Sequence, residues 1–375
     1  MPDLQKMLHD DLPPKLNYNQ SMARQPLAEI LDGLTAPARL VENQMDGSAV
    51  CQACAHHCHI QKGKRGICQV RFNRGGELRA PWGYVAGLNP DPIEKKPFAH
   101  FLPGETALTF GMLGCNFHCD FCQNWVSSQA LRDPASEESG AYIQKISPEE
   151  MITLAQRAHS KIIASSYNEP LITSEWAMDI FKLAKKEGLK TVYVSNGYST
   201  AEVLQALKPC LDGFKVDLKS MQEKTYRSMG AQLQPVLDSI MMASELGYWV
   251  EVVTLVIPDF NDSIEELWDA ARFLVSVSAD IPWHVTAFHP MYKHDHVPPT
   301  PAETLQRAAE IGQEAGLRYV YAGNLPGRVG SLENTYCPNC HTLLIERRGY
   351  SVMENKLLKE AACPACGEAI AGVWK

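Results

Sequence analysis

Three cysteines, Cys115, Cys119 and Cys122, follow one another with the spacing Cys-x3-Cys-x2-Cys. A [4Fe–4S] cluster has four irons, and each normally takes one cysteine thiolate. Three thiolates in one short loop leave one iron without a protein ligand, and an open iron can chelate a substrate. A zinc ion with His118 as its fourth ligand is the alternative. The regular strand and helix pattern that follows the loop favours the cluster.

Two further groups of cysteines also have the spacing of metal ligands. Cys51, Cys54, Cys58 and Cys68 could hold a structural zinc or an auxiliary [4Fe–4S] cluster, and the histidines between them do not decide which. Eleven of the 12 cysteines fall in the three groups, as metal ligands do, whereas disulfide partners would be scattered. The remaining one, Cys210, is predicted to be an ordinary buried thiol.

The third group lies near the end of the sequence, where two Cys-x2-Cys pairs are separated by about 22 residues. They are Cys337 with Cys340 and Cys363 with Cys366. Together they offer the four thiolates of a structural zinc ribbon, with iron in a rubredoxin-like site as the alternative. A unit this small cannot fold on apolar burial alone, so metal binding would contribute directly to its stability.

The first cysteine loop must be positioned by the elements around it, and from residue 105 onward strand-like and helix-like segments alternate. This alternation predicts an α/β fold with a parallel sheet and right-handed crossovers, as an open doubly wound sheet or as a barrel. No Gly-x-Gly-x-x-Gly follows the first strand, which disfavours a dinucleotide-binding sheet. A cysteine loop directly after that strand favours a barrel, whose sites lie at the carboxyl ends of the strands. The strand-like segments are 107–112, 162–166, 191–195, 214–218, 249–257, 283–288 and 319–324; helix-like ones include 148–160, 174–187, 201–207, 233–246 and 263–277, with Ser147 as an N-cap.

Polar residues stand where the second and third strands are expected to end. Tyr167, Asn168 and Glu169 follow the second strand, and Ser195 and Asn196 follow the third. A carboxylate in this place could bind a cationic amine, and the other side chains could hydrogen-bond a ribose or a carboxylate. The alternatives are a helix-capping loop for Glu169 and a simple turn at Asn196, because Asn-Gly is a strong turn signal.

Three ionisable residues on later strands are candidate catalytic groups. Asp217 and Lys219 are two apart on the fourth strand and so project to one face, where unpaired charges are costly. We expect them to pair with each other, with Glu251 or with a ligand. On the sixth strand His284 and His289 are five apart and point to opposite faces, and we expect His284 to face inward.

Composition excludes several classes of function. With a net charge of −8 the 375-residue chain is a poor candidate for broad binding to nucleic acid or anionic membranes. No apolar run approaches the roughly 20 residues of a membrane span, and the first residues lack the apolar stretch of a signal peptide. The expected location is the cytoplasm.

The sequence resembles the radical S-adenosylmethionine (SAM) enzyme of the AmmeMemoRadiSam system, within the wider group similar to pyruvate formate-lyase activating enzymes. The resemblance covers most of the chain. Its supporting segments are 51–68, Asp-Pro-Ile-Glu-Lys-Lys-Pro-Phe at 91–98, 114–125, 167–170, 195–198, 216–219, 255–262, 321–323 and the closing cysteine pairs.

This resemblance implies a partial (β/α)6 barrel, with a [4Fe–4S] cluster on Cys115, Cys119 and Cys122 whose open iron holds SAM. Phe121 would pack on the adenine. Implied partners are SAM, an electron donor such as flavodoxin or ferredoxin, and AMMECR-type and Memo-type proteins. The expected organisation is a polar segment (1–45), a cysteine-rich segment (46–104), the barrel (105–330) and a zinc-ribbon-like domain (331–375). By the resemblance the SAM and substrate pocket would be lined by Glu169, Ser195, Asn196, Asp217, Lys219 and His284.

Two other functions stay open on the sequence. One is a non-catalytic iron–sulfur or zinc scaffold, against which the polar residues at the strand ends count. The other is radical SAM modification of RNA, which the acidic balance disfavours. A local basic patch keeps the RNA hypothesis open; it consists of Lys62, Lys64, Arg65, Arg71 and Arg74.

Overall fold

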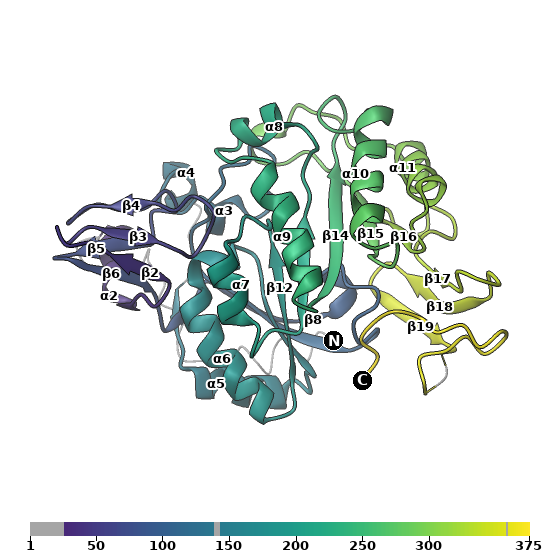
Figure 1. Cartoon of the computed structure of the whole chain (residues 1–375), viewed down its shortest axis with the longest axis horizontal. Coiled ribbons are helices and arrows are strands. Elements are labelled where there is room, and N and C mark those ends of the chain that lie inside the picture. The colour runs from purple at the N-terminus through teal and green to yellow at the C-terminus, as the bar shows by residue number, and fades with distance from the viewer. Residues whose placement is uncertain (1–25, 139–142, 358) are drawn as a thin grey trace. The chain divides into compact units, whose positions relative to one another are not determined.

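A computed structural model describes residues 26–138, 143–357 and 359–375 of the chain (Figure 1). Most of the polar start expected from the sequence, residues 1–25, lies outside the described residues. The chain divides into two compact units, each of which draws on several segments. Unit 1 comprises 1–91, 106–212 and 228–231, and unit 2 comprises 92–105, 213–227 and 232–375.

Unit 1 contains the first strands of the predicted α/β pattern. Strand β11 (Ile162–Ser165) pairs in parallel with β9 (Thr106–Gly111) on one side and with β12 (Lys190–Ser195) on the other, and β8 (Gly87–Pro92) lies beside β9. Every residue of β11 is buried, as expected for a parallel strand covered on both faces. The helices of this part are α5 (Pro148–Arg157), α6 (Ser174–Lys186), which packs against β11 and β12, and α7 (Ala201–Leu207).

Local signals in the sequence fix where α5 begins. The Ser147 hydroxyl accepts from the backbone N–H of Glu150, and the Glu150 carboxylate accepts from the backbone N–H of Ser147. This reciprocal pair is a capping box, and it confirms the predicted N-cap. Pro148 occupies the first turn, where its missing N–H costs nothing.

The cysteine-rich part of unit 1 is built from short antiparallel sheets (Figure 1). Helix α2 (Leu27–Gly33) precedes β1 (Thr35–Pro37), which pairs with β6 (Glu77–Pro81). The remaining elements are β2 (Val41–Asn43), β3 (Ala49–Cys51), β4 (His59–Ile60), β5 (Phe72–Arg74), β7 (Tyr84–Val85), β10 (Gln144–Lys145), α3 (Trp125–Ser128) and α4 (Pro134–Glu138).

Unit 2 carries four consecutive parallel strands: β13 (Gly213–Asp217), β14 (Trp249–Val256), β15 (Trp283–Ala287) and β16 (Val320–Gly323). Strand β16 extends the pattern at the place that the sequence predicted. The helices are α8 (Glu223–Ser228), α9 (Gln234–Glu245), α10 (Ile264–Val277) and α11 (Ala302–Ala315), with α9 against β14 and α11 against β15 and β16. Short 3-10 turns occur at η1 (Ile93–Lys95), η2 (Pro170–Thr173, in unit 1) and η3 (Tyr292–His294).

A three-stranded antiparallel sheet of β17 (Thr335–Tyr336), β18 (Leu343–Arg348) and β19 (Ser351–Asn355) completes unit 2. It shares a small hydrophobic core with β16, in which Tyr321, Leu344 and Ile345 are all buried. Two of the closing cysteines, Cys337 and Cys363, belong to the same core. The closing metal unit is therefore packed onto the parallel strands of unit 2.

Candidate functional site

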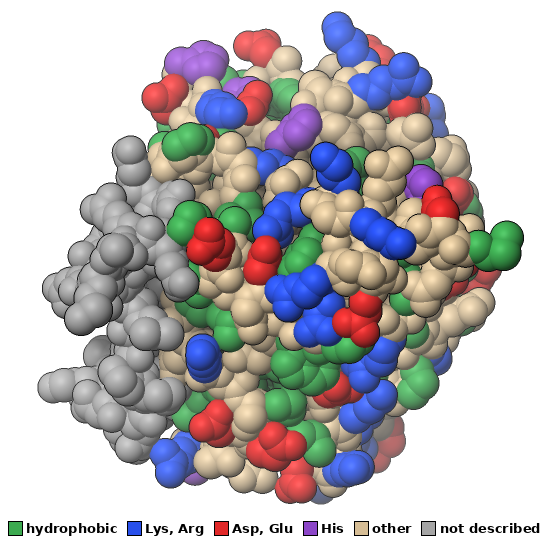
Figure 2. Space-filling view, turned by 90° about the vertical axis from the view of Figure 1, so that its left-hand side faces the viewer, with side chains coloured by type: hydrophobic (Ala, Val, Ile, Leu, Met, Phe, Trp, Pro, Cys, Tyr) green, Lys and Arg blue, Asp and Glu red, His purple; other side chains and the backbone are tan. Residues whose placement is uncertain are grey.

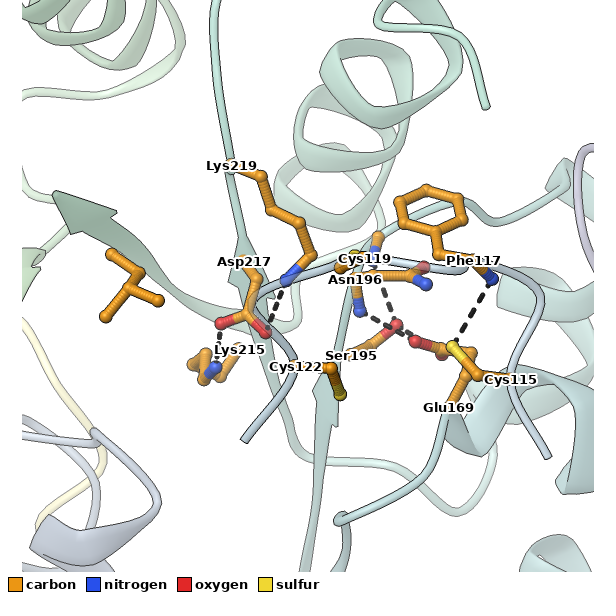
Figure 3. Close-up of polar contacts among 12 residues, drawn as sticks. Cys115, Phe117, Cys119, Cys122, Glu169, Ser195, Asn196, Lys215, Asp217 and Lys219 are labelled. Atoms are coloured by element: carbon orange, nitrogen blue, oxygen red, sulfur yellow. Dashed lines mark hydrogen bonds and ion pairs between the residues drawn. The ribbon is translucent and has the colours of Figure 1, made fainter. Parts of the chain in front are cut away.

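The loop with the first cysteine motif begins directly after β9 and ends in α3, so it lies at the carboxyl end of a parallel strand. Its sulfur atoms form hydrogen bonds with nearby groups. The Cys115 Sγ accepts from the backbone N–H of Phe117 at 3.3 Å (Figure 3). The Cys122 Sγ lies 3.2 Å from the Ser128 hydroxyl of α3. Such contacts to sulfur stabilise thiolates that hold a metal.

The segment 228–231, far away in the sequence, braces this loop within unit 1. The Met229 thioether lies 3.5 Å from the Cys119 Sγ, and the Met229 carbonyl accepts from the backbone N–H of His118. Gly230 lies against the His118 ring, where an added Cβ would come within 2.7 Å of Nε2. Met229 and Gly230 could not be predicted, because nothing local in the sequence connects them with the cysteine motif.

Gly230 provides a test of this brace. Its φ is +78°, and an alanine would meet both the cost of that backbone and the contact with His118. Gly188 is a matched control, because its φ is +74° with nothing within 4 Å. Gly188→Ala is expected to cost about 1–2 kcal/mol, and Gly230→Ala about 1–3 kcal/mol more. The measurements are the thermal unfolding temperature and the iron content after reconstitution. Equal values for Gly230→Ala and Gly188→Ala would contradict a stabilising role of segment 228–231 for the cysteine loop.

Glu169 joins the ends of two neighbouring strands. Its carboxylate accepts from the Ser195 hydroxyl at 2.7 Å and from the backbone N–H of Asn196 at 2.8 Å (Figure 3). It also accepts from the backbone N–H of Leu171 at 3.1 Å. The bond to Leu171 is the helix cap that the sequence analysis had left as an alternative. The two other bonds connect the loop after β11 with the loop after β12.

This carboxylate also lies close to the cysteine loop. Asn196 donates from Nδ2 to Oδ1 of Asn116, which stands between Cys115 and Cys119, at 2.7 Å. Burial raises the pKa of the Cys115 thiol, and the negative charge of Glu169 raises it further. Asn196 also forms the predicted turn, since its Oδ1 accepts from the backbone N–H of Tyr198.

Tyr167 and Asn168 orient the end of β11 inside unit 1. The Tyr167 hydroxyl donates to Asp91 at 2.8 Å, and Asn168 accepts from the backbone N–H of Met112 at the end of β9, at 2.9 Å. Burial and then the charge of Asp91 raise the pKa of Tyr167. The backbone of Tyr167 is left-handed, with a φ of 69°, a conformation that side chains of this size rarely adopt.

Asp217 and Lys219 lie at the end of β13 in unit 2 and form the pair that the sequence analysis considered, with Nζ of Lys219 3.5 Å from the carboxylate (Figure 3). The buried Lys215, one strand period earlier, also binds Asp217. Burial would raise the pKa of Asp217, but the charges of Lys215 and Lys219 lower it. Lys215 was not among the residues predicted for the site.

His289 is exposed, whereas His284 is buried, as is every residue of β15. The Nε2 atom of His284 lies 2.6 Å from the carboxylate of Glu251, so these two residues pair. The register places Asp217, Val253 and His284 in one row across β13, β14 and β15. Asp217 and His284 therefore share a face with one strand between them, about 10 Å apart.

Glu251, two residues before Val253 on β14, forms a buried hydrogen-bond network with His100. Glu251 accepts from the backbone N–H groups of Ala99 and His100, and from the Trp249 indole. Burial would raise the pKa of Glu251, but the hydrogen bond from His284 and the charges of His284 and His100 lower it. His100 itself is fully buried between the Tyr321 hydroxyl and the Ala371 carbonyl.

His100 predicts an acid-sensitive stability. Burial is the main cause that lowers its pKa from 6.5 to about 4. Below pH 6.5 the unfolded chain binds a proton that the folded chain does not, so the free energy of unfolding should decrease until the pH reaches about 4. The loss is on the order of 3 kcal/mol. Urea denaturation of the wild type and of His100→Gln at several pH values checks this; an equally steep decrease in the variant would contradict it.

The closing cysteines converge on one point. Cys337 and Cys366 have their Sγ atoms 3.6 Å apart, as do Cys340 and Cys363. All four sulfur atoms lie within 4.8 Å of one another. Four thiolates at 2.3 Å from one zinc ion, in a tetrahedron, lie about 3.8 Å apart. Hydrogen bonds from Thr342 lower the pKa of Cys340 to about 6, so this thiol ionises readily.

The remaining candidates lie in unit 1. Phe121 is buried in the cysteine loop, and Cys51, Cys54 and Cys68 are buried while Cys58 is half-buried. As predicted, Cys210 is a buried thiol, at the end of α7. The basic patch from the sequence is weaker than expected, because Arg71 is buried against Glu175 and Arg65 pairs with Asp32. Figure 2, which faces the left of Figure 1, shows Lys and Arg side chains interspersed with Asp and Glu.

Comparison with known families places the cysteine loop in context. The Radical SAM superfamily model matches residues 110–274, which include the loop and the ends of β11, β12 and β13. The chain carries a radical SAM domain. It is also 39% identical over 336 residues to the uncharacterized protein MJ0808 of Methanocaldococcus jannaschii, covering 89% of this chain and 98% of that protein, and the two belong to one family.

More distant relatives of this radical SAM protein have named activities. Pyruvate formate-lyase 1-activating enzyme of Escherichia coli is 25% identical over 236 residues, covering 58% of this chain and 93% of that enzyme. Among solved structures, a domain of a pyruvate-formate lyase-activating enzyme from Bacteroides vulgatus matches 43% of this chain and 98% of that domain, with 18% identity and a TM-score of 0.38. The superfamily implies a [4Fe–4S] cluster and SAM as cofactors.

Within the described residues, no helix is both long and apolar enough to span a lipid bilayer.

Proposed function

We propose that this chain is an enzyme that reductively cleaves SAM at a [4Fe–4S] cluster held by Cys115, Cys119 and Cys122, and uses the resulting radical to abstract a hydrogen atom. The observation that carries the proposal is the cysteine loop at the carboxyl end of β9, with Glu169 beside Cys115. When bound, the cluster and SAM together supply a one-electron cleavage that yields a 5′-deoxyadenosyl radical.

The residues around the loop fit a cluster with one open iron. Three sulfur atoms are available from one loop, and the backbone and Ser128 provide the contacts to sulfur that such ligands need. Tyr167, Asn168, Glu169, Ser195 and Asn196 would then hold SAM. Glu169 would bind the amino group, and its bonds to Ser195 and Asn196 keep the carboxylate in place. Phe121 would pack on the adenine.

Asp217, Lys219 and His284 are the proposed groups that face the substrate. The Lys215–Asp217–Lys219 cluster would bind a polar substrate, and His284 would move a proton while Glu251 orients its ring. Asp217 is paired with both lysines and His284 with Glu251, so a ligand would have to replace part of this pairing.

For the closing cysteines we propose zinc. The sulfur separations of 3.6 Å match the tetrahedral zinc geometry given above. The metal would stabilise the sheet of β17, β18 and β19, whose own core is small.

Activation of a partner protein is the proposed use of the radical, by analogy with the distant activating enzymes. AMMECR-type and Memo-type proteins are the proposed partners, flavodoxin or ferredoxin the proposed electron donor, and the cytoplasm the proposed location. RNA modification has less support, because Arg71 and Arg65 are engaged in ion pairs within the protein. A scaffold role leaves the Glu169 and Asp217 groups without a purpose.

The deciding experiment is anaerobic reconstitution with iron and sulfide, then addition of dithionite and SAM, with chromatography of the products. We expect 5′-deoxyadenosine and methionine in equal amounts. A protein with a full cluster that binds SAM and leaves it intact, with candidate partner proteins present, would overturn the proposal and favour the scaffold.

Glu169→Gln tests the SAM-binding role. The amide keeps the shape but lacks the charge, and it presents an N–H group where the carboxylate accepts from Asn196. We expect the Kd for SAM to increase about 10–100-fold, because a hydrogen bond to a charged group is worth about 1.5–3 kcal/mol. Calorimetric titration of the reconstituted protein measures it, with the exposed Glu187→Gln as control. An unchanged Kd would remove Glu169 from the SAM site.

A further inference from the structure

The four N-terminal thiols differ in geometry from the closing set. Among the described residues, the only group in which three or more cysteines converge within 4.8 Å is Cys337, Cys340, Cys363 and Cys366. The Cys54 thiol interacts electrostatically with those of Cys51, Cys58 and Cys68, but no three of these four sulfur atoms lie within 4.8 Å of one another. One zinc ion would need all its thiolates about 3.8 Å apart.

The loop of the radical SAM motif provides an internal comparison. The Cys115 thiol also interacts electrostatically with those of Cys119 and Cys122, and the three sulfur atoms do not all lie within 4.8 Å of one another. Thiolates that bind the corners of a [4Fe–4S] cube are bonded to different irons, so they must be further apart than thiolates on a single ion. The N-terminal set therefore resembles the cluster site of the same unit more than the single-ion site at the other end of the chain.

A buried cation without a full set of partners lies next to these thiols. Arg71 is 1% exposed and binds both Glu175 oxygens at 2.7 Å, but its Nε has no hydrogen-bond partner within the described structure. Its charge interacts with Cys51, Cys58 and Cys68. A buried N–H group left unpaired is costly. A cluster sulfur would be a suitable acceptor for it.

The N-terminal set is also braced directly on the radical SAM loop. His56, between Cys54 and Cys58, has its Nε2 2.9 Å from the carbonyl of Asn116. Arg132 donates to the carbonyl of Phe117 at 2.7 Å and also to that of Ile67, the residue before Cys68. Two separate contacts thus join the two cysteine groups inside unit 1.

A third contact limits the distance between them. A Cβ on Gly114 would lie 3.2 Å from the carbonyl oxygen of Cys68, and Gly114 precedes Cys115. With standard bond lengths, the Cα atoms of Cys68 and Cys115 are then at most about 11 Å apart. Electron transfer weakens steeply with distance and is efficient between centres on adjacent loops.

We propose that Cys51, Cys54, Cys58 and Cys68 bind a second [4Fe–4S] cluster, to which Arg71 donates an Nε–H hydrogen bond, and that this cluster exchanges single electrons with the one at Cys115, Cys119 and Cys122. A flavodoxin-class or ferredoxin-class protein, or dithionite, supplies the electron. The reduced N-terminal cluster is oxidised by one electron as the other is reduced, and no bond is formed or broken. The electron transfer rests on the proposed function; the metal assignment does not.

The metal assignment is tested in a variant that lacks the first cluster, Cys115→Ala/Cys119→Ala/Cys122→Ala. After anaerobic reconstitution it should retain roughly four irons and four sulfides per chain. It should also contain one zinc, and dithionite should produce a cluster signal in electron paramagnetic resonance. Two zinc ions and no iron would overturn the assignment. Because no SAM cleavage is measured, this result is independent of the proposed activity.

Arg71 is tested in the same background. Lysine keeps the charge but has no Nε–H, so Arg71→Lys should make the midpoint potential of the cluster more negative, because hydrogen bonds to sulfur raise it. Arg74→Lys, a change at an exposed arginine of the same segment, is the control. Equal potentials in both variants would remove Arg71 from the site. If Arg71→Lys does not fold, the metal content of the triple variant still decides the main claim.

Electron exchange has its own readout. When both clusters of the wild type are reduced, their spins should interact, so the resonance spectrum should be broader than the sum of the two single-cluster spectra. The triple variant provides the spectrum of the N-terminal cluster alone. The variant Cys51→Ala/Cys54→Ala provides the spectrum of the cluster at Cys115, Cys119 and Cys122 alone. A wild-type spectrum equal to that sum would overturn electronic contact.

Discussion

Replacing Cys119 with alanine is expected to eliminate the formation of 5′-deoxyadenosine. Cys119 is the central thiol of the radical SAM loop, is buried, and is held against Met229. With only two thiolates left on the loop, one more iron of the cluster would lack its protein ligand. Even changes around the ligands of a metal cost about 10–100-fold in affinity or activity, so losing a ligand should cost more than about 100-fold.

Chromatography of the products with dithionite and SAM measures this, together with the iron content of the variant. Cys210→Ala is the matched control, because Cys210 is equally buried but belongs to none of the three cysteine groups. We expect it to keep wild-type activity. Cleavage of SAM by Cys119→Ala at more than a hundredth of the wild-type rate would contradict the assignment of the motif.

Cys363→Ser is expected to release one zinc per chain and to unfold the closing sheet. Cys363 is buried in the small core that joins this sheet to Tyr319 and Tyr321. Structural zinc sites contribute about 10–16 kcal/mol in small domains, whereas ordinary substitutions cost about 0.5–3 kcal/mol. The packing of this small core therefore cannot compensate for the free energy lost with the metal.

Zinc analysis and limited proteolysis of residues 331–375 check this prediction. His341→Asn is the control, since His341 stands beside Cys340 with a left-handed backbone, which asparagine tolerates, and is not among the four ligands. Only Cys363→Ser should become protease-sensitive. Full zinc content in that variant would show that these cysteines are not the site.

The sequence was sufficient for the elements but not for the contacts between them. Each buried parallel strand reads as a short apolar run, so the predicted 249–257 lies within one residue of β14 and 162–166 within one residue of β11. The short strands β1 to β7 were not predicted. They have only two to five residues, and turns shape them more than hydrophobic periodicity does.

The same division applies to the site. The cysteine groups and the polar strand ends could be found from spacing alone, because ligand spacing is a local property. Met229 and the partner of His284 could not, whereas Lys215 could have been, because it is two residues before Asp217 on the same strand. Met229 reaches Cys119 across 110 residues and Glu251 reaches His284 across 33, so only the folded chain brings them together.

The carboxylate of Glu169 has a consequence for protein engineering. The loops after β11 and β12 share this single acceptor, so a change in one loop alters the hydrogen bonds of the other. A chimera that takes only one of these two loops from a relative would place Ser195 or Glu169 opposite a residue from another protein, and the hydrogen bond between the loops could be lost. The smallest segment that can be exchanged between relatives is therefore the pair of loops, transferred together.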